Sequence, residues 1–235
     1  METAFINSNA NLALVGMGYW GKNLARNLHD LGALKLICDA APERLSSATE
    51  QYPDVPVCAD YSSALADPQI TAVALATPAV SRYQMAREAL EADKDVFVEK
   101  PLSLTIREGQ DLVALAARRK RILMVGHILR YHPAVVEIQK LIREGHLGCV
   151  EYLCSNRLNI GKIRTEENIL WSFAPHDIST MLALLGKEPS SVLCQGTGYV
   201  RRQGEATKGC VTRREACRAA RSRLEAEVLS QDHRR

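Results

Sequence analysis

Short apolar runs alternate with helix-length amphipathic segments through the first 125 residues of this chain of 235. The runs are "NLALVG", "LKLICD", "VPVC", "TAVALATP", "DVFVEKP" and "RILMVGH". Runs this short and this continuously apolar are typical of strands buried on both faces. The helical patterns between them cover residues 20–31, 42–51, 80–92 and 104–118. Strands that alternate with helices form a parallel sheet with right-handed crossovers, so the sequence predicts an α/β, doubly wound (Rossmann) fold.

A second, differently built unit is predicted to follow. It has a helical pattern at 133–143, the alternating segment "GCVEYLCSNR", a helix at about 174–185 and a further strand candidate, "SSVLCQGTGYV". Two strands alone are marginal, because roughly three strands or a covering layer make a stable sheet. We therefore expect a Rossmann domain at 1–125, an incomplete α+β domain at 126–200 and a divergent basic tail at 201–235.

Composition and charge exclude several classes of protein. A hydrophobic content of 46% and a charged content of 24% are ordinary for a globular chain and exclude collagen-like, coiled-coil and wholly disordered proteins. No signal-peptide pattern and no run of roughly 20 apolar residues is found. Seven cysteines without a C-x-x-C pair fit neither a disulfide framework nor a zinc site. We expect a cytoplasmic protein with no metal and no membrane association.

The positive charge is confined to the tail. Residues 201–235 hold 10 of the 30 basic and 5 of the 27 acidic side chains, so they supply the whole net charge of +3. The body of the chain therefore carries no nucleic-acid signature. The tail is predicted to be a solvated or frayed end, with a short surface helix as the alternative.

The stretch "VGMGYWGKN" holds Gly16, Gly18 and Gly21 in the spacing G-x-G-x-x-G, which also occurs in ordinary strand-to-helix turns. Here an apolar run precedes the loop, a helical pattern follows it, and Asp39 ends the next apolar run about 20 positions further on, as a dinucleotide fingerprint requires. We expect Gly16 to permit the tight turn and Gly18 to let backbone N–H groups approach the pyrophosphate at the helix N-terminus. Gly21 would allow close helix–strand packing.

The identity of the cofactor follows from the acidic residue. The Asp39 carboxylate can accept hydrogen bonds from both hydroxyls of the adenine ribose, and it would repel the extra phosphate of NADP. Arg44 lies close in sequence and would weaken that discrimination, but no arginine follows Asp39 directly. The sequence predicts NAD as the cofactor.

Further motifs extend the pattern: "LATP", "VFVEKPLSLT", "GHILRYHPAV" and "WSFAPHDISTMLALLG". Together with the glycine loop, and in this order over about residues 11–200, they resemble the Gfo/Idh/MocA oxidoreductase family. The "GYWG-x-N" loop looks most like the branch that oxidises the sugar of nucleotide sugars, and within it the UDP-N-acetylglucosamine 3-dehydrogenases of lipid A and O-antigen (lipopolysaccharide) pathways. The resemblance implies NAD, a nucleotide-sugar substrate, a homo-oligomer and, in the lipid A branch, a partner aminotransferase.

The resemblance also implies the catalytic residues. Lys100, in the family motif with Glu99 and Pro101, stands at the carboxyl end of a strand, where ligands of open parallel sheets bind. It would polarise the reacting hydroxyl, and nearby oxidised nicotinamide and desolvation would lower its pKa. His176 matches the family histidine, and its unperturbed pKa of about 6.5 suits removal of an alcohol proton. Asp177 would orient His176 or bind substrate, or would simply start the helix.

Further candidates surround the cofactor. Thr77 and Pro78 end the fourth strand and would line the cofactor. Glu99, which precedes the catalytic lysine, is a further cofactor candidate. Tyr19 and Trp20 would pack on the cofactor or serve as ordinary packing residues.

Candidate substrate residues follow the sixth strand. Arg130, Tyr131 and His132 lie near the expected crevice, and Arg157 would meet a sugar or a phosphate. Ser172 stands where the family commonly has an acidic or amide residue, so the chain departs at this position from the auxiliary site residue that the resemblance implies.

Three functions from different classes are consistent with these observations. The first is an NAD-dependent dehydrogenase that oxidises a sugar hydroxyl, by the resemblance the 3-OH of a UDP-N-acetylhexosamine. The second is an NAD-binding module without turnover, because the resemblance stops near Arg201, family members are considerably longer, and the chain looks truncated at its C-terminus. The third is an interaction protein that uses the basic tail.

Overall fold

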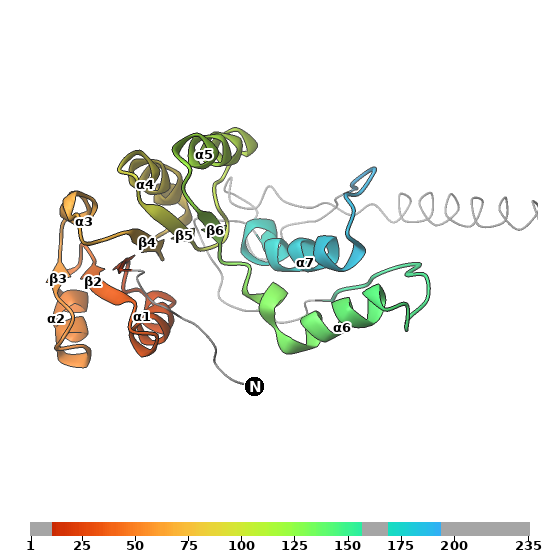
Figure 1. The fold of residues 1–235 in the computed structure, drawn as a ribbon, viewed down its shortest axis with the longest axis horizontal. Coiled ribbons are helices and arrows are strands. Elements are labelled where there is room, and N and C mark those ends of the chain that lie inside the picture. Colours follow the sequence, from red (N-terminus) through yellow and green to blue (C-terminus); the bar gives the residue numbers. More distant parts are fainter. Residues whose placement is uncertain (1–10, 157–168, 194–235) are drawn as a thin grey trace, which may run out of the picture. The chain divides into compact units, whose positions relative to one another are not determined.

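The computed structural model describes residues 11–156 and 169–193 (Figure 1). By its internal contacts the chain divides into two compact units, Met1–Tyr131 and His132–Arg235. The tail predicted at 201–235 lies outside the described residues, and the functional division of the chain at 125 and 200 stays a prediction.

The first unit is built on one parallel sheet. Its strands run in the order β3-β2-β1-β4-β5-β6, and every pairing between neighbours is parallel. The strands are β1 (Leu12–Val15), β2 (Leu34–Cys38), β3 (Val57–Cys58), β4 (Ala72–Leu75), β5 (Asp95–Val98) and β6 (Leu123–Val125). The order reverses between β1 and β4, which defines the switch point of a doubly wound sheet and confirms the predicted Rossmann fold.

Helices connect the strands. They are α1 (Gly21–Asp30), α2 (Pro42–Gln51), α3 (Tyr61–Ala66), α4 (Ala79–Glu91) and α5 (Ile106–Arg119), with the 3₁₀ helix η1 (Ile128–Tyr131) after β6. Local capping sets several of the starts: Thr105 and Glu108 form a reciprocal capping box at α5, and Pro42 occupies the first turn of α2. The sequence analysis missed α3, which is too short to show a helical period, although Asp60 caps it by accepting a hydrogen bond from the Ser62 N–H.

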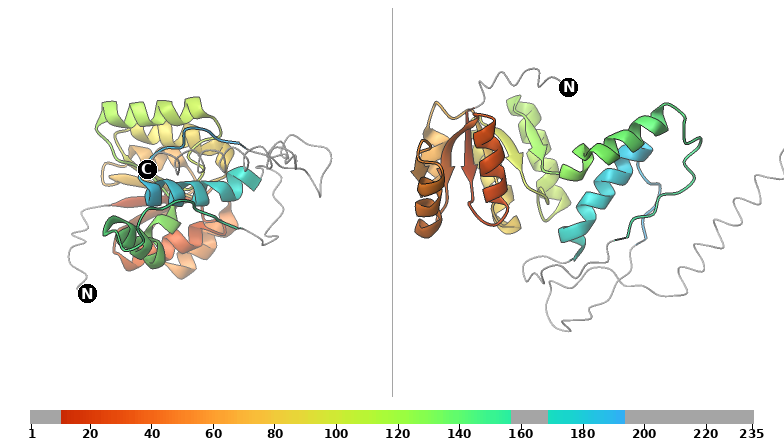
Figure 2. Two further views of the ribbon diagram at one scale, coloured as in Figure 1. Left: turned by 90° about the vertical axis from the view of Figure 1, so that its right-hand side faces the viewer. Right: turned by 90° about the horizontal axis from the view of Figure 1, so that it is seen from below.

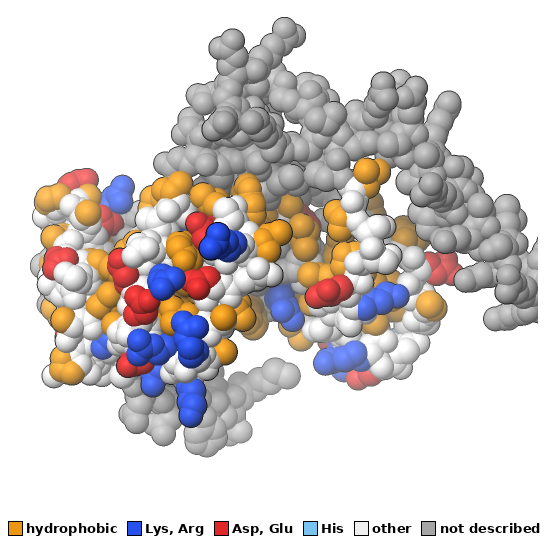
Figure 3. Space-filling model, turned by 90° about the horizontal axis from the view of Figure 1, so that it is seen from above, with side chains coloured by type: hydrophobic (Ala, Val, Ile, Leu, Met, Phe, Trp, Pro, Cys, Tyr) orange, Lys and Arg blue, Asp and Glu red, His pale blue; other side chains and the backbone are white. Residues whose placement is uncertain are grey.

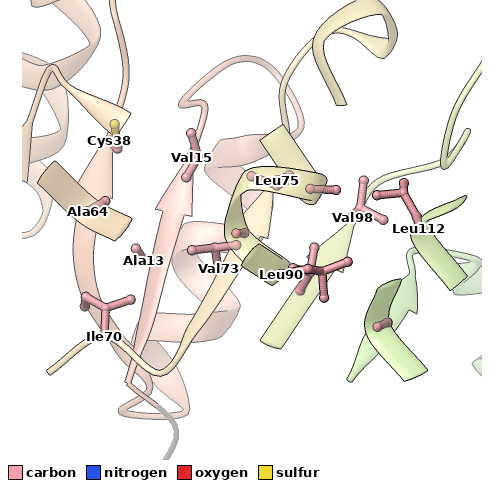
Figure 4. Close-up of a cluster of buried hydrophobic side chains, with 14 of the residues drawn as sticks. Ala13, Val15, Cys38, Ala64, Ile70, Val73, Leu75, Leu90, Val98 and Leu112 are labelled. Carbon is pink, nitrogen blue, oxygen red and sulfur yellow. The ribbon is translucent and has the colours of Figure 1, made fainter. Parts of the chain in front are cut away.

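The helices cover both faces of the sheet (Figure 2). Because successive side chains of a strand point to opposite faces, one strand serves two cores. Ala13 and Val15 of β1 join the cluster under α3, α4 and α5, which Figure 4 shows with Leu75 and Leu90. Leu14 joins the other cluster, against α1 and α2. Burial on both faces explains why these strands read as continuous apolar runs.

Charged side chains on α4 and α5 pair with one another. The Arg87 guanidinium lies 2.9 Å from an Asp111 oxygen and 3.1 Å from a Glu91 oxygen. Figure 3 shows basic and acidic side chains intermingled on one face of the first unit. Exposed ion pairs of this kind each contribute only about 0–1 kcal/mol, so the two apolar cores carry the stability of the unit.

The second unit contains two helices in its described part, α6 (Pro133–Arg143) and α7 (Ile169–Leu185). They contact each other, and the Gln139 side-chain amide donates a hydrogen bond of 3.0 Å to the Ala183 carbonyl. The prediction for α6 is confirmed. Helix α7 begins earlier than the predicted residue 174 and continues through Pro175.

The strands predicted for the second unit are absent from its described residues. Residues 149–156, from "GCVEYLCSNR", have no strand structure, and neither do residues 191–193 of the second candidate. A strand needs a hydrogen-bonded partner, and alternating hydrophobicity by itself does not supply one. The rest of both candidate segments lies outside the described residues.

The central strand β4 gives a test of where the stability resides. Leu75 is fully buried, so Leu75→Ala should lower the free energy of unfolding by about 2–5 kcal/mol in urea denaturation followed by circular dichroism. Val80, at the start of α4, is 65% exposed, and Val80→Ala should change stability by less than about 0.5 kcal/mol. Equal effects of the two substitutions would contradict the assigned core.

Candidate active site

The glycine loop joins β1 to α1 at the carboxyl edge of the sheet. Gly16 has a φ of +98°, and a Cβ there would lie 2.9 Å from the Ala76 carbonyl oxygen. A Cβ on Gly21 would collide with the Gly16 carbonyl oxygen. Neither position therefore accepts another residue without a shift of backbone, which agrees with the predicted roles in the turn and in packing.

Gly18 has a different reason to be glycine. Apart from its two chain neighbours, no atom of the described residues lies within 4 Å of the position that its Cβ would occupy, so packing against them does not explain the glycine. The helix α1 that follows has no side-chain cap at Trp20 and no acidic residue in its first turn. Open space beside an uncapped helix N-terminus fits the pyrophosphate of a dinucleotide. The pyrophosphate must come close to the backbone, and it binds to backbone N–H groups that no acidic side chain occupies.

Asp39, at the end of β2, fixes the shape of this loop. Its carboxylate is buried and accepts a 2.6 Å hydrogen bond from the Met17 N–H and a 2.9 Å hydrogen bond from the Ala41 N–H. The half-exposed guanidinium of Arg44 lies 3.4 Å from the same oxygen that Met17 contacts. A carboxylate has about four acceptor positions, so a ribose that uses both its hydroxyls must displace Arg44.

The end of β4 carries a buried hydroxyl. The Thr77 Oγ1 atom is buried and has no hydrogen-bond partner among the described residues. Buried polar atoms in native proteins nearly always have a partner, so Thr77 fits a residue that meets a bound polar molecule. Pro78 follows it, is exposed and occupies the position just before α4.

Arg82 is a residue of this edge that the sequence analysis missed. From the first turn of α4 it donates hydrogen bonds to the carbonyls of Thr77 (2.8 Å), Lys100 (2.6 Å) and Pro101 (3.2 Å). One guanidinium therefore holds the end of β4 and the cis Lys100–Pro101 turn after β5 together. The only sequence signal was its place in the first turn of a helix that follows a strand, which puts it near the carboxyl edge.

The two aromatic residues of the glycine loop differ in their surroundings. Tyr19 is 83% exposed. Trp20 is half-buried, and its Nε1–H donates a 2.7 Å hydrogen bond to Oε1 of Glu99. Ordinary packing therefore does not account for Trp20, because it makes a specific bond to the residue before Lys100.

Glu99 is buried at the end of β5, and burial raises the pKa of its carboxyl group. The hydrogen bond from Trp20 and the positive charges of Arg82 and Lys100 oppose that shift. A buried carboxylate that still has a specific donor is typical of a functional or positioning residue.

His127 is a second residue that the sequence analysis missed. Its Nδ1 atom is buried and no partner for it is found in the described part of the chain. Burial, together with the positive charges of Arg130 and Lys100, lowers the pKa of His127, so the imidazole is neutral near pH 7. The motif "GHILRYHP" contained this histidine, but nothing in its spacing separated it from its neighbours.

The candidate substrate residues lie at the surface. Arg130 and Tyr131 are exposed on η1, and His132 caps α6 by accepting a 3.2 Å hydrogen bond from the Ala134 N–H. His132 therefore has a structural role within the second unit. Arg157 lies outside the described residues.

The histidine predicted as the base lies on α7 in the second unit. The His176 carbonyl accepts hydrogen bonds from the hydroxyls of Ser179 and Thr180, which lie three and four residues further along the helix. Asp177 accepts a 2.8 Å hydrogen bond from Ser155. Asp177 does not start the helix, because α7 begins at Ile169. Lys100 and His176 belong to different units, and their pairing stays a prediction.

The fold and the glycine loop together define an NAD-binding Rossmann protein. The model of the Gfo/Idh/MocA oxidoreductase family, described as having an NAD-binding Rossmann fold, matches residues 10–127, just over half of the chain. The chain belongs to this family, and its cofactor is NAD.

Several known proteins are similar to this chain. An uncharacterized oxidoreductase, YrbE of Bacillus subtilis, is 27% identical over 194 residues, which are 80% of this chain and 57% of the relative. The UDP-N-acetylglucosamine 3-dehydrogenase of Acidithiobacillus ferrooxidans is 28% identical and is covered to 58%. A solved oxidoreductase structure from Klebsiella pneumoniae matches with a TM-score of 0.65 and 31% identity, over 77% of this chain and 52% of that one.

The chain thus spans little more than half the length of these relatives. Among its described residues, none of the helices is both long and apolar enough to cross a membrane.

The contrast between Gly18 and Gly16 predicts two separable effects. Gly18→Ala should leave the free energy of unfolding within about 0.5 kcal/mol of wild type, since its Cβ enters open space, and should weaken NAD binding by about tenfold or more. Gly16→Ala should lower both. Chemical denaturation and a fluorescence titration with NAD measure the two quantities. Undiminished NAD binding by Gly18→Ala would contradict the pyrophosphate site expected beside Gly18.

Glu99 predicts a pH dependence of stability. Because its pKa is raised above the usual 4.5 in the folded protein, the unfolded chain releases this proton first as the pH rises. The stability of wild type relative to Glu99→Gln should therefore be greatest below about pH 4.5 and should fall as the pH rises through the raised pKa. Denaturation midpoints measured from pH 4 to pH 8 test this, and a constant difference would contradict it.

Proposed function

We propose that this chain carries the NAD-binding and hydroxyl-polarising part of a dehydrogenase that oxidises a sugar hydroxyl. The observation that carries the proposal is the position of Lys100. It follows β5 at the same carboxyl edge of the sheet as the glycine loop and the buried hydroxyl of Thr77. Ligands of doubly wound sheets bind at this edge, so a lysine there faces the reacting end of a bound cofactor.

Each residue then has a role in an alcohol oxidation. NAD, when bound, accepts the hydride from the sugar carbon. Lys100 binds the hydroxyl oxygen and stabilises the negative charge that develops on it. His176 accepts the hydroxyl proton, for which a neutral imidazole near pH 7 is suited. Asp177, held by Ser155, is the adjacent substrate-binding residue in the proposed site.

For the substrate we propose a nucleotide sugar, oxidised at the 3-OH of a UDP-N-acetylhexosamine. Support comes from the "GYWG-x-N" loop and from the similarity to a protein named UDP-N-acetylglucosamine 3-dehydrogenase. Arg130 and Tyr131, exposed just after β6, are of the types that bind phosphate and stack on a planar base or sugar. A 3-keto nucleotide sugar is a substrate for an aminotransferase, and a homo-oligomer is the proposed assembly.

A second candidate function has its own support. The first unit is covered on both faces of its sheet, whereas the described part of the second unit has two helices and no strand. An NAD-binding module without turnover is consistent with that difference. It predicts cofactor binding and no product.

Mixing the purified chain with NAD and UDP-N-acetylglucosamine tests both candidates. We expect NADH fluorescence to rise, and we expect Lys100→Ala to lower the rate by about a hundredfold or more because the developing alkoxide loses its cation. Lys35→Ala, at an exposed position of β2, is the matched control and should keep the wild-type rate.

An NAD titration on the same samples separates the outcomes. NAD binding without NADH across a panel of nucleotide sugars would favour the module. NADH formation that survives Lys100→Ala would contradict the assigned role of the lysine.

A further inference from the structure

The bond between Trp20 and Glu99 joins two strands that are not neighbours. Trp20 belongs to the loop after β1 and Glu99 follows β5, and β4 lies between these strands in the sheet. Neighbouring strands are about 4.8 Å apart, so the two strand ends are separated by about 10 Å. Backbone hydrogen bonds of the sheet do not reach that far, so this side-chain bond supplies a direct link between the cofactor loop and the residue next to Lys100.

The residue types at both ends suit such a link. Tryptophan combines the length to cross a strand with a single N–H donor at its far edge. The acceptor carboxylate is buried, with only 6% of Glu99 exposed, so the bond forms away from bulk water, where charge-assisted hydrogen bonds are strongest.

Gly126 completes the arrangement from a third strand. It follows β6, and a Cβ at this position would lie 2.8 Å from Glu99 Oε1, the atom that accepts the bond from Trp20. Its N–H donates to the Val98 carbonyl, which fixes the backbone beside Glu99. The absence of a side chain at Gly126 therefore leaves the room that the carboxylate occupies.

We propose that Trp20, Glu99 and Gly126 form a strap across the carboxyl edge that holds the glycine loop in register with Lys100. Glu99 and Trp20 are thus positioning residues, and Glu99 acts through Trp20 rather than as a ligand of the cofactor. The part of this proposal that concerns Lys100 rests on the proposed dehydrogenase function. The part that concerns the cofactor loop requires only that the chain binds NAD.

A double-mutant cycle on NAD binding distinguishes a strap from two separate ligands. Trp20→Phe keeps an aromatic ring and removes the donor, and Glu99→Leu removes the acceptor. Each should weaken NAD binding about five- to tenfold, and the double variant should bind no more weakly than the weaker single variant. Glu99→Gln keeps an acceptor oxygen and should bind NAD nearly as well as wild type. Val113→Ala, at a 59% exposed position of α5, is the control and should have no effect.

Gly126→Ala tests the bond between Trp20 and Glu99 through the space around the carboxylate. Its new Cβ would displace the end of the Glu99 side chain, which moves more easily than backbone, so NAD binding should weaken as in Trp20→Phe while the protein stays folded. In Trp20→Phe, Gly126→Ala should then have no further effect.

The bond itself is observable without a ligand. The chain has two tryptophans, so an amide correlation NMR spectrum shows two indole N–H signals. The signal that disappears in Trp20→Phe should shift in Glu99→Leu and in Gly126→Ala, and it should stay near its wild-type position in Glu99→Gln.

Three results would overturn the strap. Additive losses of NAD affinity in the double variant would mean that Trp20 and Glu99 contact the cofactor separately. Unchanged NAD affinity of the folded single variants, with only lowered stability, would mean that the bond serves the fold alone. Absence of NAD binding by wild type would also refute it. Lack of NADH formation with intact coupling would refute only the dehydrogenase function.

Discussion

Parallel pairing of six strands is the constraint on which the rest of this molecule depends. Because every strand runs in the same direction, every carboxyl end meets at one edge of the sheet. Residues as distant in sequence as Gly18, Asp39, Thr77 and Lys100 are brought to that edge by the fold alone. The same pairing obliges each connection to cross a face of the sheet, so the helices bury both faces and leave the edge as the open part of the unit.

Strand ends also leave backbone groups without ladder partners, and side chains with fixed geometry satisfy many of them here. Asp39 accepts from the N–H of Met17 in the glycine loop, and Arg82 donates to carbonyls after both β4 and β5. These are charge-assisted hydrogen bonds between elements far apart in sequence, so they are stronger than neutral bonds and specify one shape of the edge. Charged side chains therefore hold the backbone of the cofactor site in one shape.

The sequence predicted the features that follow from local pattern. The six strands and the helices that connect most of them depend on periodicity and on spacing, and these are confirmed. The geometry at Gly16 and Gly21 agrees with the turn and the close packing predicted for them. Arg82 and His127 were not predicted as site residues. Their importance arises from contacts between separate elements, and no local sequence pattern encodes such contacts. Residues 149–156 were predicted as part of a strand but do not form one, because alternation shows only that a sequence is compatible with a strand, whereas pairing decides whether the strand forms.

The described parts of the two units differ in how completely they bury their apolar residues. In the first unit, both sheet faces have a closed core, so the NAD-binding edge is supported from within the unit. In the second, α6 has no buried residue and α7 exposes Ile178 and Leu182. A histidine can act as a base only if it is held in the right place. That requires a fixed position of the helix that carries it. The contacts that hold the NAD-binding edge therefore lie within the first unit, whereas the proton transfer proposed for His176 also requires that α7 be held in place.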